Sequence, residues 1–222
     1  MSELVTLEAL DVDGAIQEAA YAVDPEGGGT RADLFKKAAI GGGALVAGGV
    51  AFGGLLALAL GAPSKRQDVA ILNYALTLEY LEAAFYAEAL REAGLTGPTR
   101  RFAQVAGAHE AAHVVAIRKL LGRQAVARPR FDFKNTTQSV RAFQRTAIAV
   151  EDLGVSAYAG QGPRIKQQAV IKAALAIHSV EARHAAWIRN IVGQNPSPAA
   201  FDPARDMQQV LRAVGQTGFI QS

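Results

Sequence analysis

The chain has 222 residues, of which 50% are hydrophobic and 19% are charged, and it contains no cysteine. This composition excludes a disordered polyelectrolyte and a disulfide-stabilised scaffold, and the length suits one domain with a well-buried core. Because the chain has no thiolates, any metal ion must be bound by histidine and carboxylate ligands.

Charge divides the chain into three parts. Residues 1–37 carry 3 basic and 8 acidic side chains, residues 38–62 carry none, and residues 63–222 carry 20 basic and 12 acidic ones. The net charge of +3 therefore combines an acidic N-terminal region with a strongly basic remainder. The acidic region has a candidate amphipathic helix at Leu7–Ala22, and its sequence assigns it no role.

The charge-free residues 38–62 have the length of apolar chain that spans a bilayer as a helix. They fit a secretory signal cleaved near Ala59 or Ala62, or an uncleaved transmembrane anchor. Thr30–Lys37 resembles a twin-arginine export signal in which Ala32 replaces the second arginine. A glycine-rich buried helix or a linker is the alternative for this segment.

The remaining sequence predicts an all-α domain of four long helices at residues 63–193, followed by a linker and a short packed helix at residues 194–222. Proline in a first turn and glycine just after an end are typical helix boundaries. The expected bounds are Gln67–Ala93 for the first helix, Pro98 to Gly122 for the second, and Pro163 to Gly193 for the fourth. The third helix is expected to follow Asn135–Thr137 and to end near Gly160, and a short helix is expected from Pro203 to about Val214, capped by Asp202.

The connections predict the topology of the bundle. The first and third links are short and favour antiparallel neighbours, whereas Arg123–Lys134 is long enough to run the length of a helix. Two antiparallel hairpins joined by one long crossover form a ferritin-like four-helix bundle, in contrast to a simple up-down-up-down bundle.

Each predicted hairpin carries one glutamate followed by a Glu-x-x-His motif. The first offers Glu79, Glu110 and His113, and the second offers Glu151, Glu181 and His184. Residues three apart share a helical face, and these positions lie on apolar stripes, so the carboxylates are expected to point into the core. Such a set can bind two divalent ions of iron or manganese.

The spacing of these residues indicates an internal duplication. Glu79 and Glu110 are 31 positions apart, Glu151 and Glu181 are 30 apart, and each lone glutamate is followed seven residues later by Tyr86 or Tyr158.

These features resemble the ferritin-like superfamily, and more closely its branch of exported bacterial proteins related to desiccation-associated proteins. The resemblance covers Gln67–Ser222 and rests on Leu72–Glu82, Glu151–Tyr158 and Val180–His184. It implies a carboxylate-bridged site for two Fe ions, or Fe and Mn, with the six ligands Glu79, Glu110, His113, Glu151, Glu181 and His184.

Several neighbouring residues have alternative roles. Glu82 competes with Glu79 as a ligand or lies just outside the ligand set, and His178 is either an outer partner of the ligands or a structural residue. Tyr86 and Tyr158 either bond a ligand carboxylate, transfer electrons, or simply pack in the core. Trp187 is expected to pack.

The segment His109–His113 also matches the zinc-protease motif H-E-x-x-H. That interpretation leaves Glu79, Glu151 and the second Glu-x-x-His motif without a role. Four ordinary surface glutamates and a degenerate site without metal are further alternatives.

The sequence thus predicts a di-metal protein that oxidises Fe(II) with oxygen or peroxide, either exported or anchored with its bundle outside the cytoplasm. A position on the cytoplasmic face of the membrane is the alternative. The basic remainder suits anionic phospholipids or cell-wall polyanions and argues against iron storage, and nucleic acid is not expected as a partner. The oligomeric state, homo-oligomers included, stays open. The alternative function is a non-catalytic stress-related or desiccation-related envelope scaffold.

Overall fold

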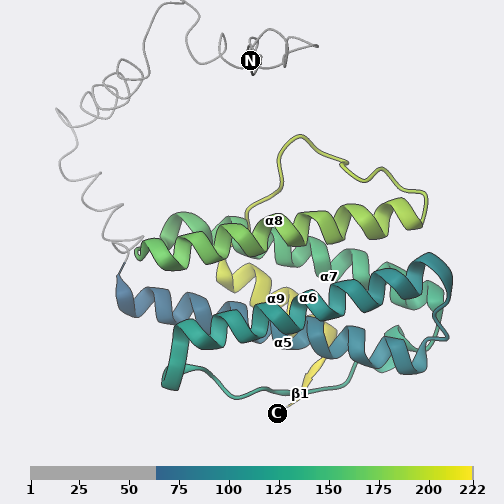
Figure 1. The fold of residues 1–222 in the computed structure, drawn as a ribbon, viewed down its shortest axis with the longest axis horizontal. Helices are drawn as coiled ribbons and strands as arrows, with labels where there is room; N and C mark the ends of the chain where they lie inside the picture. The colour runs from purple at the N-terminus through teal and green to yellow at the C-terminus, as the bar shows by residue number, and fades with distance from the viewer. Residues whose placement is uncertain (1–63, 222) are drawn as a thin grey trace, which may run out of the picture. The chain divides into compact units, whose positions relative to one another are not determined.

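The computed structural model describes residues 64–221 of the chain, which form a bundle of long helices (Figure 1). The four long helices are α5 (Lys65–Glu92), α6 (Gly97–Leu121), α7 (Val140–Gln161) and α8 (Gln168–Ile191), and α9 (Met207–Thr217) is shorter. This arrangement confirms the all-α prediction. The acidic region 1–37 and the predicted membrane segment 38–62 lie outside the described residues.

Within residues 64–221, none of the helices combines the length and the apolar character that are needed to cross a membrane.

The long connection between α6 and α7 runs along α5, as the sequence predicted. Near the start of α5, the Asn73 side chain donates to the Gln124 carbonyl and accepts from the Val126 N–H. Near its end, the Thr137 hydroxyl donates to Glu88. Because both ends of the connection are tied to opposite ends of one helix, α5/α6 and α7/α8 are two hairpins joined by a crossover.

This crossover contains short regular segments that the sequence did not predict. They are the 3-10 turns η1 (Gly122–Gln124) and η2 (Lys134–Thr137) and the strand β1 (Arg130–Phe131). β1 pairs antiparallel with the C-terminal strand β2 (Ile220–Gln221), and the Phe133 and Phe219 rings meet edge to face beside them. The C-terminal segment is therefore fixed to the crossover.

The predicted start of the fourth helix at Pro163 is wrong. Pro163 lies in the 3-10 turn η3 (Gly162–Arg164), and α8 begins at Gln168. The buried Asp68 carboxylate accepts the backbone N–H groups of Lys166 and Gln167, which holds the chain in a loop before the helix starts. A long-range bond of this kind has no local sequence signature.

The predicted start of the short C-terminal helix was also too early. α9 begins at Met207, and its cap is Asp206 instead of Asp202. The Asp206 carboxylate accepts the Gln209 N–H while the Gln209 side chain accepts the Asp206 N–H, which is a capping box. The linker before α9 lies directly on α7, because a Cβ at Gly160 would be 1.8 Å from the Arg205 carbonyl oxygen.

The core contains two apolar clusters along α5. The first surrounds Ile71, Leu72 and Leu76, and the second surrounds Phe85 and Tyr86. Between these stretches of α5 lie Glu79 and Glu82, both buried. A fold that buries carboxylates between two apolar clusters must compensate their charge.

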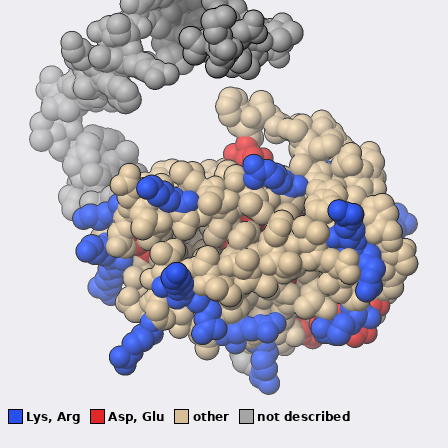
Figure 2. Space-filling model, in the orientation of Figure 1, with Lys and Arg blue, Asp and Glu red and all other residues tan. Residues whose placement is uncertain are grey.

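Half of the acidic side chains of residues 63–222 are buried. Six of the 12 are in the interior, namely Asp68, Glu79, Glu82, Glu110, Glu151 and Glu181. Lys and Arg side chains accordingly predominate over acidic ones on the face shown in Figure 2.

Candidate metal centre

Four helices contribute to one buried polar cluster. Its members are Glu79 of α5, Glu110 and His113 of α6, Glu151 of α7, and Glu181 and His184 of α8. The four glutamates are fully buried and His184 is 2% exposed. All six residues that the sequence singled out are therefore brought together, because each lies on the face of its helix that points into the bundle.

The first group of potential ligands surrounds the His113 ring. His113 Nδ1 lies 3.1 Å from Glu79 Oε2, 2.9 Å from Glu110 Oε2 and 3.2 Å from Glu181 Oε1. One ring nitrogen carries at most one hydrogen, so it cannot donate a full bond to three carboxylates at once. These four atoms are close enough to one another to hold one cation between them.

The second group surrounds the His184 ring. His184 Nδ1 lies 3.0 Å from Glu110 Oε1, 3.3 Å from Glu151 Oε2 and 4.0 Å from Glu181 Oε2. Glu110 and Glu181 thus each turn one oxygen toward His113 and the other toward His184. The two ligand groups share these two carboxylates.

Several atoms of the cluster are buried without a hydrogen-bond partner. They are Glu110 Oε1, Glu151 Oε2, both carboxylate oxygens of Glu181, and His184 Nδ1. An unpartnered buried polar group is costly, and two bound divalent cations, one in each group, would satisfy all of these atoms. Oxygen and imidazole ligands suit iron and manganese, so the residues present fit a pair of such ions.

Comparison with known protein families agrees with this geometry. The family model described as a ferritin-like domain matches residues 67–194, which include both hairpins and all six cluster residues. The chain belongs to the ferritin-like domain family. No curated protein matches it.

The two tyrosines of the ferritin-like bundle cross between its hairpins. Tyr86 of α5 donates its hydroxyl hydrogen to Glu151 Oε1, and Tyr158 of α7 donates to Glu79 Oε1. Each lone glutamate thus uses one oxygen for the tyrosine of the other hairpin and turns its second oxygen toward the histidine of its own hairpin. Glu79 and Glu151 each belong to only one ligand group, and these bonds fix the orientation of their carboxylates.

His109 contacts the cluster from outside, which the sequence reasoning missed. Its Nδ1 lies 2.9 Å from His184 Nε2, and the two rings stack at an interplanar angle of 15°. His109 therefore holds the nitrogen of His184 that faces away from the carboxylates. The H-E-x-x-H interpretation required His109 and His113 to share one metal, and the structure instead places His109 behind His184. In the sequence, the only sign of this role was the position of His109 directly before Glu110.

Glu82 lies beside the cluster rather than in either ligand group. A Cβ at Gly154 would be 3.3 Å from both Glu82 Oε1 and Glu181 Oε2, so the absence of a side chain there leaves room for the two carboxylates. Of the two candidates on α5, the structure places Glu79 within ligand distance of the others and leaves Glu82 outside.

His178 and Trp187 are away from the ligand atoms. The Nε2 atom of His178 has no hydrogen-bond partner, and its ring lines a surface hollow together with Tyr158. Trp187 packs edge to face on Phe102, as expected of a core residue.

Electrostatics within the cluster favour protonated histidines when no cation is bound. Burial raises the pKa of Glu79, Glu82 and Glu151, and raises that of Glu181 to about 8. Burial also acts to raise the pKa of Glu110, but His113 and His184 outweigh it and lower that pKa to about 2. Burial opposes the charge of both imidazoles, yet the carboxylates raise the pKa of His113 to about 12 and of His184 to about 10. A metal ion would replace these protons.

Proposed function

We propose that this chain binds two iron ions, or one iron and one manganese, and oxidises Fe(II) with oxygen or peroxide. The observation that carries the proposal is the sharing of Glu110 and Glu181, whose separate oxygens face His113 and His184. Carboxylates that bridge two nearby cations offset the repulsion between them. Four buried glutamates match the charge of two divalent ions.

Iron bound at these residues would supply two electrons, one from each Fe(II), which with two protons reduce O2 to H2O2 or H2O2 to two molecules of water. The residues of the chain hold the ligand atoms in place for this chemistry. Tyr86 and Tyr158 orient Glu151 and Glu79, and His109 orients the ring of His184. Outer partners of this kind fix ligand orientation and tautomer.

Metal content is the direct test of the proposal. The full-length chain is loaded anaerobically with Fe(II) or Mn(II), and bound metal is measured by elemental analysis beside the Glu110→Ala/Glu181→Ala double variant. Glu92→Ala is the matched control, because Glu92 is exposed on α5. We expect about two ions per wild-type and control chain and a nearly complete loss in the double variant, which retains only two carboxylates for two ions. No bound metal, or equal binding by the double variant, would contradict the proposal.

Catalysis is tested on the loaded protein by following Fe(II) oxidation with O2 and with H2O2. If the protein binds both ions but oxidises Fe(II) no faster than the double variant, the non-catalytic scaffold is the better function.

We further propose that the protein acts at the cell envelope and belongs to the exported, desiccation-related branch of ferritin-like proteins. The support is the charge-free segment 38–62 that precedes the bundle, together with the basic surface that suits anionic envelope polymers. Fractionation of cells that express the full chain or a chain without residues 38–62 tests this placement. Loss of the envelope fraction on deletion is expected, and an unchanged distribution would contradict it.

Protease treatment of intact cells separates the two faces of the membrane. An exported bundle is expected to be accessible to the protease. A protected bundle that becomes accessible only after lysis would favour the cytoplasmic face.

A further inference from the structure

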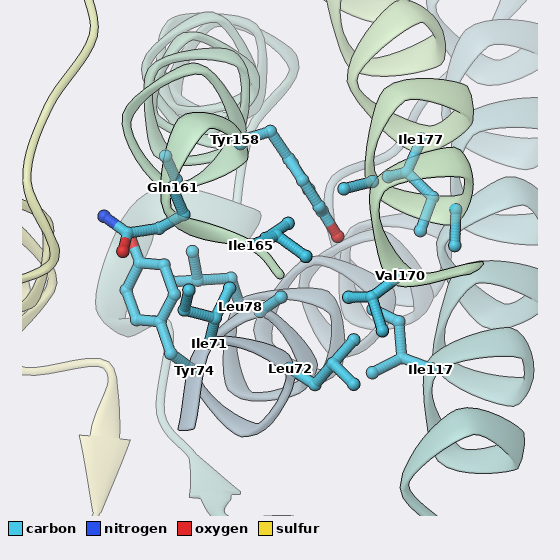
Figure 3. Close-up of a pocket in the computed structure, with 15 residues that line it drawn as sticks. Ile71, Leu72, Tyr74, Leu78, Ile117, Tyr158, Gln161, Ile165, Val170 and Ile177 are labelled. Atoms are coloured by element: carbon cyan, nitrogen blue, oxygen red, sulfur yellow. The ribbon is translucent and has the colours of Figure 1, made fainter. Parts of the chain in front are cut away.

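One end of the bundle is built from the first turns of α5 and α8 and the last turns of α6 and α7. The buried Asp68 carboxylate of α5 accepts two backbone N–H groups just before α8, and the Asn73 side chain bonds the backbone just after α6. Figure 3 shows Ile117 of α6 and Val170 of α8 turned toward one small cavity inside this end. The described chain begins here, so we call it the entry end and define it as residues 65–72, 115–124 and 156–175.

The charge of the entry end is strongly one-sided. The only acidic residue of its three segments is Asp68, which is buried and bonded to the backbone before α8. Asp202 and Asp206 belong to the linker that lies on α7, outside these segments, where the Arg205 N–H donates to the Ser156 carbonyl. Eight basic side chains of the entry end are all exposed, namely Lys65, Arg66, Arg118, Lys119, Arg123, Arg164, Lys166 and Lys172.

The opposite end of the bundle differs in charge. Residues 85–107, 139–148 and 184–193 carry six basic residues and two acidic ones, Glu88 and Glu92. Figure 2 shows basic side chains gathered at the left end of the molecule, where α5 and α8 begin in Figure 1, while acidic side chains accompany the basic ones at the lower right. The entry end is therefore the more positive of the two.

Two large apolar side chains are exposed among the basic residues of the entry end. Leu120 follows Lys119 on α6 and is 41% exposed, and Leu175 lies three residues after Lys172 on α8 and is 60% exposed. A membrane surface accepts both kinds of side chain, because its headgroups can be anionic and their boundary with the acyl chains is apolar. A polyanion dissolved in water attracts mainly the basic ones. The mixture therefore favours a lipid surface as the partner.

The sequence leads to the entry end directly from the charge-free residues 38–62. Only Pro63 separates them from Ser64, which caps α5. Three residues of extended chain reach about 10 Å. A bilayer that takes up residues 38–62 would therefore hold Lys65, and with it the entry end, close to its headgroups.

We propose that the entry end docks on anionic phospholipid headgroups and holds the bundle against the membrane by this face. Each basic side chain close to an anionic membrane surface strengthens binding by about fivefold, and the entry end offers eight of them. The inference rests on the proposed position at the cell envelope, and it names the partner and the face of the bundle that meets it.

Fluorescence quenching by labelled headgroups tests this orientation. The full-length, metal-free protein is reconstituted into vesicles of phosphatidylcholine, alone or mixed with phosphatidylglycerol, that carry a quencher on their headgroups. Because the chain has no cysteine, Ala169→Cys and Asn190→Cys each provide a single site for a fluorophore. Both positions are exposed on α8 and lie about 30 Å apart, the first in the entry end and the second in the opposite end.

Strong quenching at Ala169→Cys and weak quenching at Asn190→Cys are expected in the vesicles with phosphatidylglycerol. In pure phosphatidylcholine the bundle loses its electrostatic contact, so the difference between the two labels should shrink. Equal quenching of the two labels in the anionic vesicles, or a difference of the same size in pure phosphatidylcholine, would overturn the proposal.

Removal of charge from either end of one helix gives the second readout. Arg118→Gln/Lys119→Gln is expected to lower the ratio of docked to undocked bundle by about 25-fold. Arg100→Gln/Arg101→Gln is the matched control, because it removes two exposed charges from the opposite end of α6 and should change the ratio little. Added salt should weaken docking of the wild type, which needs no substitution. Equal effects of the two variants, or docking that is insensitive to salt, would overturn the proposal.

Competition separates lipid from other anionic partners. Short duplex DNA, added at the same concentration of charge as the anionic lipid, is expected to leave the quenching at Ala169→Cys unchanged. Displacement of the entry end by DNA would favour a nucleic-acid partner and overturn the assignment to lipid. If cell fractionation places the chain outside the envelope, the proposed position fails, and the vesicle measurement still decides whether the entry end contacts anionic lipid.

Discussion

The two tyrosines make equivalent bonds in different surroundings. Tyr86 and Tyr158 each orient the lone glutamate of the opposite hairpin. The ring of Tyr86 is enclosed by aromatic residues, with Phe85, Phe102 and Phe143 at centroid distances of 5.4 to 5.9 Å. The ring of Tyr158 instead borders two apolar cavities. Tyr86 is thus packed among aromatic rings, whereas Tyr158 lies beside cavities and makes the same kind of bond.

The two histidines of the candidate centre differ in a similar way. His109 stacks on His184, whose side chain is 3% exposed, while the His113 side chain is 12% exposed. The residue before Glu181 that corresponds to His109 is Val180, which cannot donate a side-chain hydrogen bond. The candidate ligands of the two hairpins match, and the residues around them do not. The His184 side of the candidate centre is thus the more tightly enclosed of the two.

The largest expected effect separates shared from unshared ligands. Glu110→Ala removes a carboxylate that both ligand groups use, so we expect binding of both ions to be lost. Glu79→Ala removes an oxygen from the His113 group only, so one ion per chain is expected to remain bound beside His184. Elemental analysis and calorimetric titration with Fe(II) measure both stoichiometries. Equal losses in the two variants would refute the division into two groups.

Metal affinity is expected to rise with pH. The pKa of His113 is raised to about 12 and that of His184 to about 10 in the metal-free protein, so both carry protons at neutral pH that a cation must displace. Displacing these two protons, together with the proton of Glu181, whose pKa is raised to about 8, makes binding at least about 100-fold tighter for each unit of pH between about pH 6 and pH 8, and falling pH releases the metal. Competition with a chelator across this range measures the slope. A flat profile would contradict the displacement of these protons.

Substitution of His109 breaks the asymmetry between the histidines. His109→Ala removes the partner of His184 Nε2 and is expected to weaken metal binding by about 10-fold to 100-fold, the usual cost of losing an outer partner of a ligand. Val180→Ala, at the corresponding position of the other motif, is the control and should change affinity little. Calorimetric titration of both variants compares them. Equal affinities would show that the stacked ring has no role in binding.

The smallest expected effect compares the surroundings of Tyr86 and of Tyr158 by their effect on stability. Ala106→Leu adds volume beside the aromatic cluster, where Ala106 is fully buried, and is expected to lower the free energy of unfolding by about 1–3 kcal/mol. Ala174→Leu adds the same volume next to existing cavities and should cost less than about 1 kcal/mol. Urea unfolding measures both. A larger loss of unfolding free energy for Ala174→Leu than for Ala106→Leu would show that the residues around Tyr158 do not accommodate the added volume.

The sequence predicted the bundle and the six-residue cluster because both depend on local periodicity. Helix bounds marked by Pro98 and Gly122 were nearly correct, and the spacing of the two Glu-x-x-His motifs placed their side chains on inward faces. The start of α8 could not be predicted, because it depends on Asp68, which lies about 100 residues earlier in the chain. The contact between His109 and His184 likewise joins two helices, and no periodic pattern of one helix reveals it.

The two metal positions are tested most directly by an anomalous diffraction map of crystals of the full-length protein that have been soaked anaerobically in Fe(II). We predict two iron peaks, one beside His113 and one beside His184, with Glu110 and Glu181 between them. A single peak, or none at these six residues, would contradict the central claim that the shared carboxylates join two metal positions.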